Sequence, residues 1–164
     1  MELPIKDTPS LALIQRGYGG AVDVEAISDC MQLLRLAKVL LGFFYARFAE
    51  HDISPGKYSV LMELLAQEED ESLSPSILAE RIGVTRPTIT GLIDGLVRQG
   101  FVLRRNLEQD RRGVAISLSD AGREFMRSFL PGQFDAMAGV VSALSAGQRQ
   151  ALRDALTTLE GSLR

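Results

Sequence analysis

Hydrophobic residues recur with helical spacing over one long stretch, from about Val24 to Ala49. One apolar series repeats every seven positions, and a second series, which includes Phe43 and Phe44, widens the stripe. The pattern predicts a long amphipathic helix. A helix this long and apolar needs more cover than one small domain offers, so we expect part of it to pack on another subunit.

Three shorter helices are indicated by start and stop signals. Ser54 and Ser74 each precede a proline, which is the order of an N-cap followed by the first helical position. The helix after Ser74 should end near Gly83. Thr85 then caps a third helix, which Gly100 should end.

Two short runs with a period of two follow. Phe101 and Leu103 alternate with Val102 and Arg104, and the apolar residues Val114, Ile116 and Leu118 alternate with Ala115 and Ser117. The intervening segment, 106–113, is polar. This arrangement predicts a β-hairpin of two short strands. The fold class is therefore mainly α with a minor β part.

Two further helices complete the chain. Ser119 caps a long one, which Pro131-Gly132 should kink or break. The stretch SAGQ at 145–148 has the sequence of a capping box and should start the last helix. Residues 1–22 show no sustained period, so we interpret them as an irregular arm before a single domain at 23–164.

Charge is unevenly distributed, although the net charge of the 164 residues is only −3. Residues 50–80 hold eight acids against one lysine, whereas residues 81–112 hold seven arginines against three acids. The second segment is therefore a local basic region, and local potential decides where a polyanion docks. Chance clustering on solvated faces would explain the charge alone equally well.

Several function classes are disfavoured. The chain has one cysteine and one histidine, with no metal-ligand spacing and no nucleotide-binding or nucleophile motif. We therefore expect no enzyme activity, no metal and no cofactor. The single cysteine is typical of a cytoplasmic protein, and no signal peptide or membrane span is indicated.

The stretch LAERIGVTRPTITGL at 78–92 has the outline of a helix-turn-helix, and the hairpin behind it makes the combination a winged helix. The outer face of the helix that starts at Thr85 has threonine, glycine and arginine where a solvated face usually carries lysine and glutamate. Short side chains let base edges and phosphates approach. Gly95 has two open interpretations, a bare backbone for DNA or tight packing within the protein. The candidate recognition residues are Arg86, Pro87, Thr88, Thr90, Gly91 and Arg98.

Over nearly all of residues 24–163 the chain resembles the MarR family of bacterial transcription regulators. The most specific piece is DRRGVAISLSDAGREF at 110–125, which is similar to the wing signature of that family. The resemblance implies an obligate homodimer with intertwined terminal helices, about 23–50 and 119–164. Two winged helix-turn-helix lobes, about 54–118, would read a near-palindromic operator in double-stranded DNA.

The resemblance also assigns roles to residues of the wing. Asp94 and Asp110 match acids that orient wing arginines. Pro87, Gly91 and Gly95 depart from the longer polar or basic residues that are frequent in the family, which affects which bases are read. The candidate wing arginines are Arg104, Arg105, Arg111 and Arg112.

The regulator is expected to be a repressor relieved by a small ligand, since family effectors bind between the dimerisation helices and the lobe. Aromatic walls with one cation would suit a small aromatic acid. An equally open interpretation is that these residues only form core and surface contacts. The candidate pocket residues are Phe43, Phe44, Arg47 and Tyr58.

Cys30 offers an alternative function. One branch of the family senses organic hydroperoxides through a cysteine on the first helix. Leu34 and Phe44 stand where that branch has tyrosines, so we favour a buried structural cysteine over a redox sensor. A dimeric interaction module that binds no DNA is a third alternative, which the wing arginines disfavour.

Overall fold

The computed structural model describes residues 16–17, 22–68, 71–106 and 114–163. Most of the arm predicted at 1–22 and most of the loop predicted at 106–113 lie outside these residues. The chain divides into two compact units between Tyr58 and Ser59, and each unit is described here by itself. The single domain expected at 23–164 stays a prediction.

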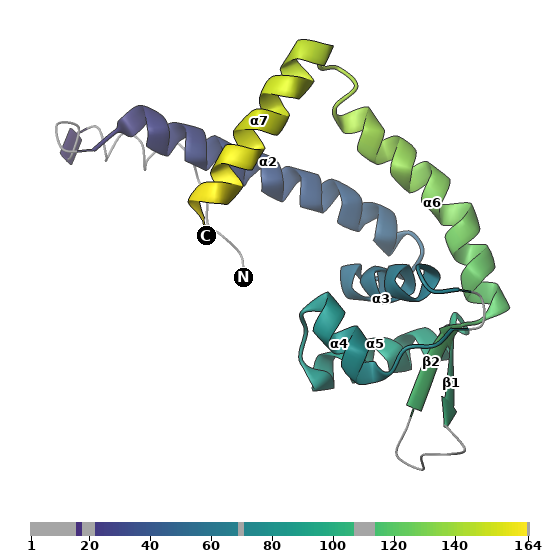
Figure 1. Ribbon diagram of the computed structural model, residues 1–164. Coiled ribbons are helices and arrows are strands. Elements are labelled where there is room, and N and C mark those ends of the chain that lie inside the picture. The colour runs from purple at the N-terminus through teal and green to yellow at the C-terminus, as the bar shows by residue number, and fades with distance from the viewer. Residues whose placement is uncertain (1–15, 18–21, 69–70, 107–113, 164) are drawn as a thin grey trace. The chain divides into compact units, whose positions relative to one another are not determined.

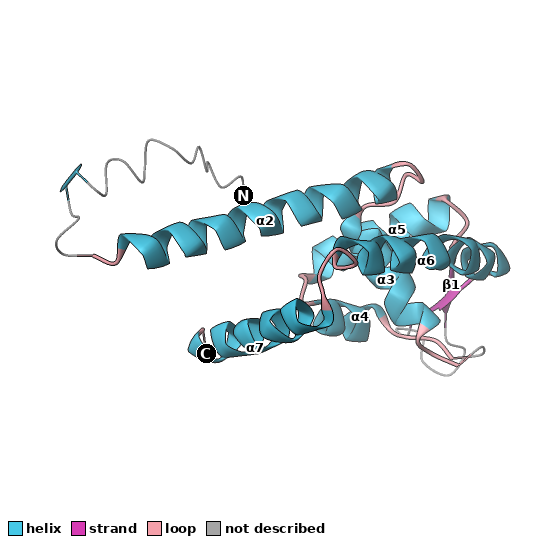
Figure 2. Cartoon of the chain, turned by 90° about the horizontal axis from the view of Figure 1, so that it is seen from above, coloured by secondary structure: helices cyan, strands magenta, loops and turns pink. Residues whose placement is uncertain are grey.

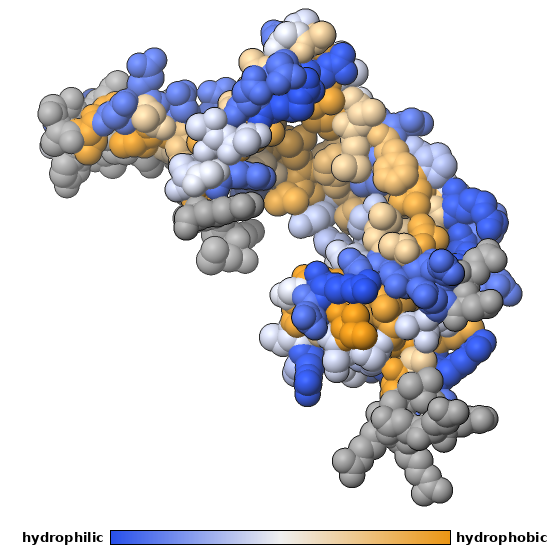
Figure 3. Space-filling view, in the orientation of Figure 1, coloured by the Kyte–Doolittle hydropathy of each residue, from blue (hydrophilic) through white to orange (hydrophobic). Residues whose placement is uncertain are grey.

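The first unit contains the long helix α2, Val24–Ala49, with the bounds that its hydrophobic pattern predicts. Asp23 caps it, because its carboxylate accepts a hydrogen bond from the Ala26 N–H at 2.9 Å. Only Phe48 is buried along its 26 residues. Figure 3 shows hydrophobic residues at its surface. Its large exposed apolar residues are Leu33, Leu34, Leu36, Val39, Leu41, Phe43 and Tyr45.

The turn after α2 is a Schellman motif built on a residue other than glycine. The Ile53 N–H donates to Phe48 O at 3.0 Å and the Asp52 N–H donates to Ala49 O at 3.1 Å. Asp52 has a φ of 54°, in the left-handed region. Phe48 and Ile53 are both buried, which is the apolar contact that accompanies this motif.

The second unit holds the predicted helix-turn-helix and hairpin, and Figure 2 shows that helices dominate it. The two strands are antiparallel, with Val102 opposite Leu118 and Asn106 opposite Val114. Leu73 adds an isolated bridge to Ile116. The helices are α3 (Pro55–Leu65), which begins in the first unit and continues into the second, α4 (Pro75–Ile82), α5 (Arg86–Arg98), α6 (Asp120–Val140) and α7 (Ala146–Ser162). The strands are β1 (Val102–Asn106) and β2 (Val114–Leu118).

The core of this unit lies where α4, α5 and the hairpin meet, with further side chains from α3 and α6. Helix α4 contacts α5 and β2, α5 contacts β1, and α6 contacts β2. Each predicted helix start is confirmed by a side-chain cap. The capping box at Ser145 has both of its hydrogen bonds. The largest fully buried side chains of the core are Val60, Leu61, Leu78, Ile89, Ile93, Leu96, Val102, Ile116 and Met126.

Helix α6 corrects half of one expectation, because it continues through Pro131 to Val140 without a break; a kink at Pro131-Gly132 stays a prediction. Proline removes one backbone hydrogen bond and crowds the preceding turn, at a cost of about 3 kcal/mol. Phe129 and Gln133 on either side of it are buried. Sequence spacing alone does not reveal this burial.

Candidate nucleic-acid interface

The turn between α4 and α5 follows from local sequence. Gly83 adopts a φ of 73°, which glycine reaches without steric cost. Its N–H donates to Glu80 O, and the Val84 N–H donates to Ala79 O at 3.0 Å, which is a second Schellman motif. Ala79 is buried at this close approach. Figure 1 shows α4 and α5 on either side of this turn, as expected for a helix-turn-helix.

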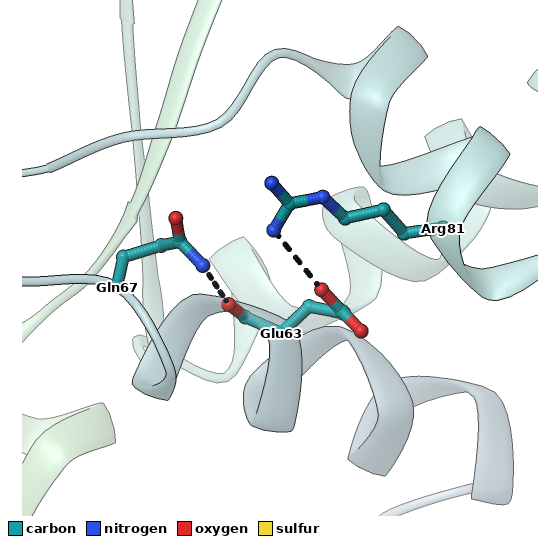
Figure 4. Close-up of polar contacts among 3 residues, drawn as sticks. All are labelled: Glu63, Gln67 and Arg81. Carbon is teal, nitrogen blue, oxygen red and sulfur yellow. Dashed lines mark hydrogen bonds and ion pairs between the residues drawn. The ribbon is translucent and has the colours of Figure 1, made fainter.

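An ion pair links α4 of the helix-turn-helix to α3. Arg81 Nη1 on α4 lies 3.4 Å from Glu63 Oε2 on α3. The Gln67 side chain donates to the Glu63 carbonyl at 3.0 Å (Figure 4). Both charged groups are partly exposed, so the pair contributes little to stability.

Helix α5 has one buried and one exposed face, as its pattern predicts. Ile89, Ile93 and Leu96 are buried. All six candidate recognition residues, Arg86 to Thr88, Thr90, Gly91 and Arg98, are exposed. The two glycines differ: Gly91 is exposed, and a Cβ there would meet nothing within 4 Å. Gly95 is buried, which favours the packing interpretation for it.

The threonines of α5 are partly engaged within the helix. Thr85 is the N-cap, accepting from the Thr88 N–H, and its hydroxyl lies 2.8 Å from that of Thr88. The Thr90 hydroxyl donates to Arg86 O at 2.9 Å. A hydroxyl has one hydrogen to donate and two lone pairs. In this conformation Thr90 can therefore accept a hydrogen bond from a base amino group but cannot donate one to a phosphate.

In the described part of the wing, Arg104 and Arg105 lie on opposite faces of β1. Side chains alternate along a strand, and Val102 is buried. Arg104 shares the Val102 face, and its Nη2 lies 3.0 Å from Asp94 Oδ1 on α5. Arg105 is exposed and falls on the opposite face with Leu103. The structure thus brings Asp94 and Arg104 together, whereas Asp110, Arg111 and Arg112 lie outside the described residues.

Comparisons with known proteins agree with this geometry. A model of the MarR family matches residues 53–114. The transcriptional repressor YetL of Bacillus subtilis is 38% identical over 124 residues, covering 76% of this chain and 74% of YetL. The chain belongs to the MarR family. Membership places it among transcription regulators rather than enzymes. The repressor MprA of Escherichia coli is 34% identical over 88 residues, 54% of this chain and 50% of MprA.

Solved structures support the same fold for this MarR-family chain. AbsC of Streptomyces coelicolor, a MarR family transcriptional regulator, aligns with a TM-score of 0.70 at 23% identity, over 87% of this chain and 96% of AbsC. A MepR–DNA complex of Staphylococcus aureus aligns with a TM-score of 0.64 at 21% identity, over 82% and 96%. Both likenesses confirm the mainly helical winged-helix fold.

The candidate pocket residues all lie in the first unit. The rings of Phe43 and Phe44 meet edge to face at 5.2 Å. Tyr58 stacks on Phe48 at 4.6 Å, and burial raises the pKa of its phenol. A hollow of about 440 Å³ lies elsewhere on α2, lined by Gln32, Arg35, Leu36 and Val39. A ligand pocket at the four predicted residues stays a prediction.

Cys30 corrects another expectation, because it is exposed on α2 and not buried. Apolar neighbours along the helix suggested a core position, but most of α2 is uncovered in this chain. Among the described residues, no group of three or more His, Cys, Asp or Glu could hold a metal ion. No helix of the described ranges is long and apolar enough to cross a membrane.

One structural residue of the site was missed. Gly122, in the Ser-x-x-Gly that follows the wing, approaches Phe101 so closely that a Cβ would lie 2.1 Å from its carbonyl oxygen. The Ser-x-x-Gly pattern was visible in the sequence, but only as the start of a helix. Its contact with the end of α5 depends on the fold.

Proposed function

We propose that the protein is a homodimeric, sequence-specific DNA-binding regulator, acting as a repressor relieved by a small ligand. The observation that carries the DNA-binding part is the exposed face of α5. It offers arginine, short hydroxyls and bare backbone at Gly91, next to a wing arginine held by Asp94. In this arrangement α5 lies in the major groove, where base edges are distinguishable. Such a regulator works in the cytoplasm, where bacterial DNA lies.

Exposed apolar surface on the helices outside the lobe supports the homodimer. Helix α7 has no buried residue, although Leu152, Leu156 and Leu159 form an apolar stripe. Figure 3 shows further hydrophobic residues along α6. Exposed patches of this kind mark interaction sites. A symmetric dimer would cover them and would present two copies of α5 to a near-palindromic operator.

Two measurements test this proposal. Sedimentation should give a dimer at micromolar concentration, and removal of residues 145–164 should leave aggregates or an unfolded monomer. A gel shift with the DNA that flanks its own gene should show a complex that survives excess scrambled DNA. A stable wild-type monomer, or binding that scrambled DNA removes completely, would contradict it.

The effector part of the proposal is tested separately. Phe43, Phe44 and Tyr58 would provide aromatic walls, and Arg47 would pair with a carboxylate. Salicylate-like acids should therefore raise the melting temperature of wild type and raise that of Arg47→Ala less. An equal shift in both proteins would remove Arg47 from the pocket.

The exposure of Cys30 favours testing a second candidate function, an organic-hydroperoxide-responsive regulator. Cumene hydroperoxide should then release bound DNA from wild type but not from Cys30→Ser. Release from neither protein would leave the ligand-responsive repressor as the function. Release from both would show damage that does not involve this thiol.

A further inference from the structure

The end of the recognition helix α5 is bonded directly to the start of α6. Gly100 and Phe101 close α5 in a third Schellman motif, with their N–H groups donating to Val97 O and Leu96 O, both at 3.0 Å. The carbonyls of the same two residues accept hydrogen bonds from Ser119, the N-cap of α6. The Ser119 hydroxyl donates to Gly100 O at 2.6 Å, and its N–H donates to Phe101 O at 3.0 Å.

Gly122 completes this contact by its lack of a side chain. Its N–H donates to the Ser119 hydroxyl at 2.9 Å, so the first turn of α6 lies against Phe101. A Cβ at Gly122 would lie 2.1 Å from the Phe101 oxygen and 3.0 Å from its carbonyl carbon. Because those atoms are backbone, no side-chain rotation can relieve the clash. The Phe101 ring stacks on Phe125 of α6 at 4.7 Å, which adds a second link.

We propose that Gly100, Phe101, Ser119 and Gly122, here called the α5–α6 junction, set the angle between the recognition helix and α6, and thereby the half-site separation that the dimer reads. This inference rests on the proposed function, in which the exposed apolar residues of α6, such as Phe134 and Met137, contact the partner. Ser119 and Gly122 are positioning residues, which act on DNA only through α5.

A small change in the angle between α5 and α6 would move α5 by more than one base pair along the DNA. Helix α6 is 21 residues long, or about 30 Å. A rotation of about 10° at one end displaces the other by about 5 Å, which exceeds the base-pair rise of about 3.4 Å. Half-sites read by a symmetric dimer lie about one helical turn apart. A small change at the junction therefore moves α5 out of register with the second half-site.

The test begins with wild type and a library of random-sequence duplexes, roughly 30 base pairs long so that two half-sites fit. Wild type should enrich two half-sites at one separation. Two more duplexes are then made from that sequence, one with a base pair inserted between the half-sites and one with a base pair deleted. The affinities of wild type, Gly122→Ala, Ser119→Ala and Ser119→Thr are measured on all three duplexes. The matched control is Gly139→Ala on the same helix, where a Cβ meets nothing within 4 Å.

Gly122→Ala should bind the wild-type duplex about thirtyfold or more weakly, as expected for one misaligned base contact in each of two half-sites. Its preferred separation should shift or broaden, and its affinity for scrambled DNA should be unchanged. Ser119→Ala should broaden the preference, and Ser119→Thr should restore it, because threonine keeps the cap and the donor. Gly139→Ala should match wild type.

A folded, dimeric Gly122→Ala with wild-type affinity and wild-type spacing preference would overturn the proposal. If Gly122→Ala does not fold, the proposal stands or falls on whether Ser119→Ala keeps the wild-type spacing preference. If wild type enriches no sequence at all, the proposed function fails first. The two failures are thus distinguishable.

Discussion

Gly91→Ala should make the protein more stable and a weaker binder of its operator. Gly91 lies inside α5 with helical backbone, and a Cβ there meets nothing within 4 Å. Alanine in a helix interior is more favourable than glycine by about 1 kcal/mol. For a chain of this size that gain raises the melting temperature by roughly 2–4 °C.

The same methyl group would stand on the face that the DNA approaches. If base edges or phosphates come close to the bare backbone, the methyl lengthens at least one contact in each half-site. The cost is about 1–3 kcal/mol for each half-site, which is roughly thirtyfold or more in the affinity of a dimer for its operator. Thermal melts followed by circular dichroism, and fluorescence anisotropy with labelled operator, measure the two effects on one sample.

Two other glycines serve as controls. Gly139→Ala, which is equally open but lies in the last turn of α6, should raise the melting temperature by less and leave DNA binding unchanged. Gly100→Ala should lower the melting temperature, because a φ of 75° is strained for any L residue. A lower melting temperature for Gly91→Ala would refute the propensity argument. A higher one with unchanged operator affinity would show that the bare backbone is not used.

Three further predictions concern single side chains. In urea denaturation, a double-mutant cycle of Asp94→Ala and Arg104→Ala should give a coupling of only about 0.2–1 kcal/mol, since both side chains are partly exposed; a larger value would mean that the pair is more buried. Arg105→Ala should flatten the salt dependence of DNA binding by about one unit for each phosphate that the arginine neutralises; an unchanged slope would place Arg105 away from DNA. Because burial raises the pKa of Tyr58 above its unfolded value of 10.0, its contribution to stability is fully present below pH 10 and is lost as the pH rises through the raised pKa. Tyr58→Phe should therefore lose less stability than wild type between neutral pH and pH values above that pKa, and equal losses would contradict this.

Helix starts were predictable because their signals are local. The side chains of Ser74 and Thr85 each accept a hydrogen bond from the backbone N–H three residues later. This cap depends only on the residue type at the helix start, so it can be predicted from the sequence. Gly83 and Gly100 marked helix ends for the same reason. The left-handed turn at Asp52 could not be predicted from its residue type, because aspartate adopts a positive φ much less often than glycine.

Features that depend on tertiary packing were not predictable in this way. Gly91 and Gly95 look alike on the helix, but one is open and the other buried. Helix α6 continues through Pro131 with buried residues on either side of it, and the closeness of Gly122 to Phe101 exists only in the fold. Strand alternation does place Arg104 and Arg105 on opposite faces of β1. The sequence therefore allowed the two arginines to be distinguished, although they were predicted as one group.

Binding of Arg86→Ala to operator and to scrambled DNA tests directly whether α5 reads base sequence. Arg86 is exposed at the start of α5, and arginine there can make two hydrogen bonds to a guanine edge. We expect the variant to lose operator affinity by about 1–3 kcal/mol per half-site, with little change on scrambled DNA at the same salt concentration. Equal losses on both DNAs would show that Arg86 only contacts phosphate, and that this residue does not carry the recognition.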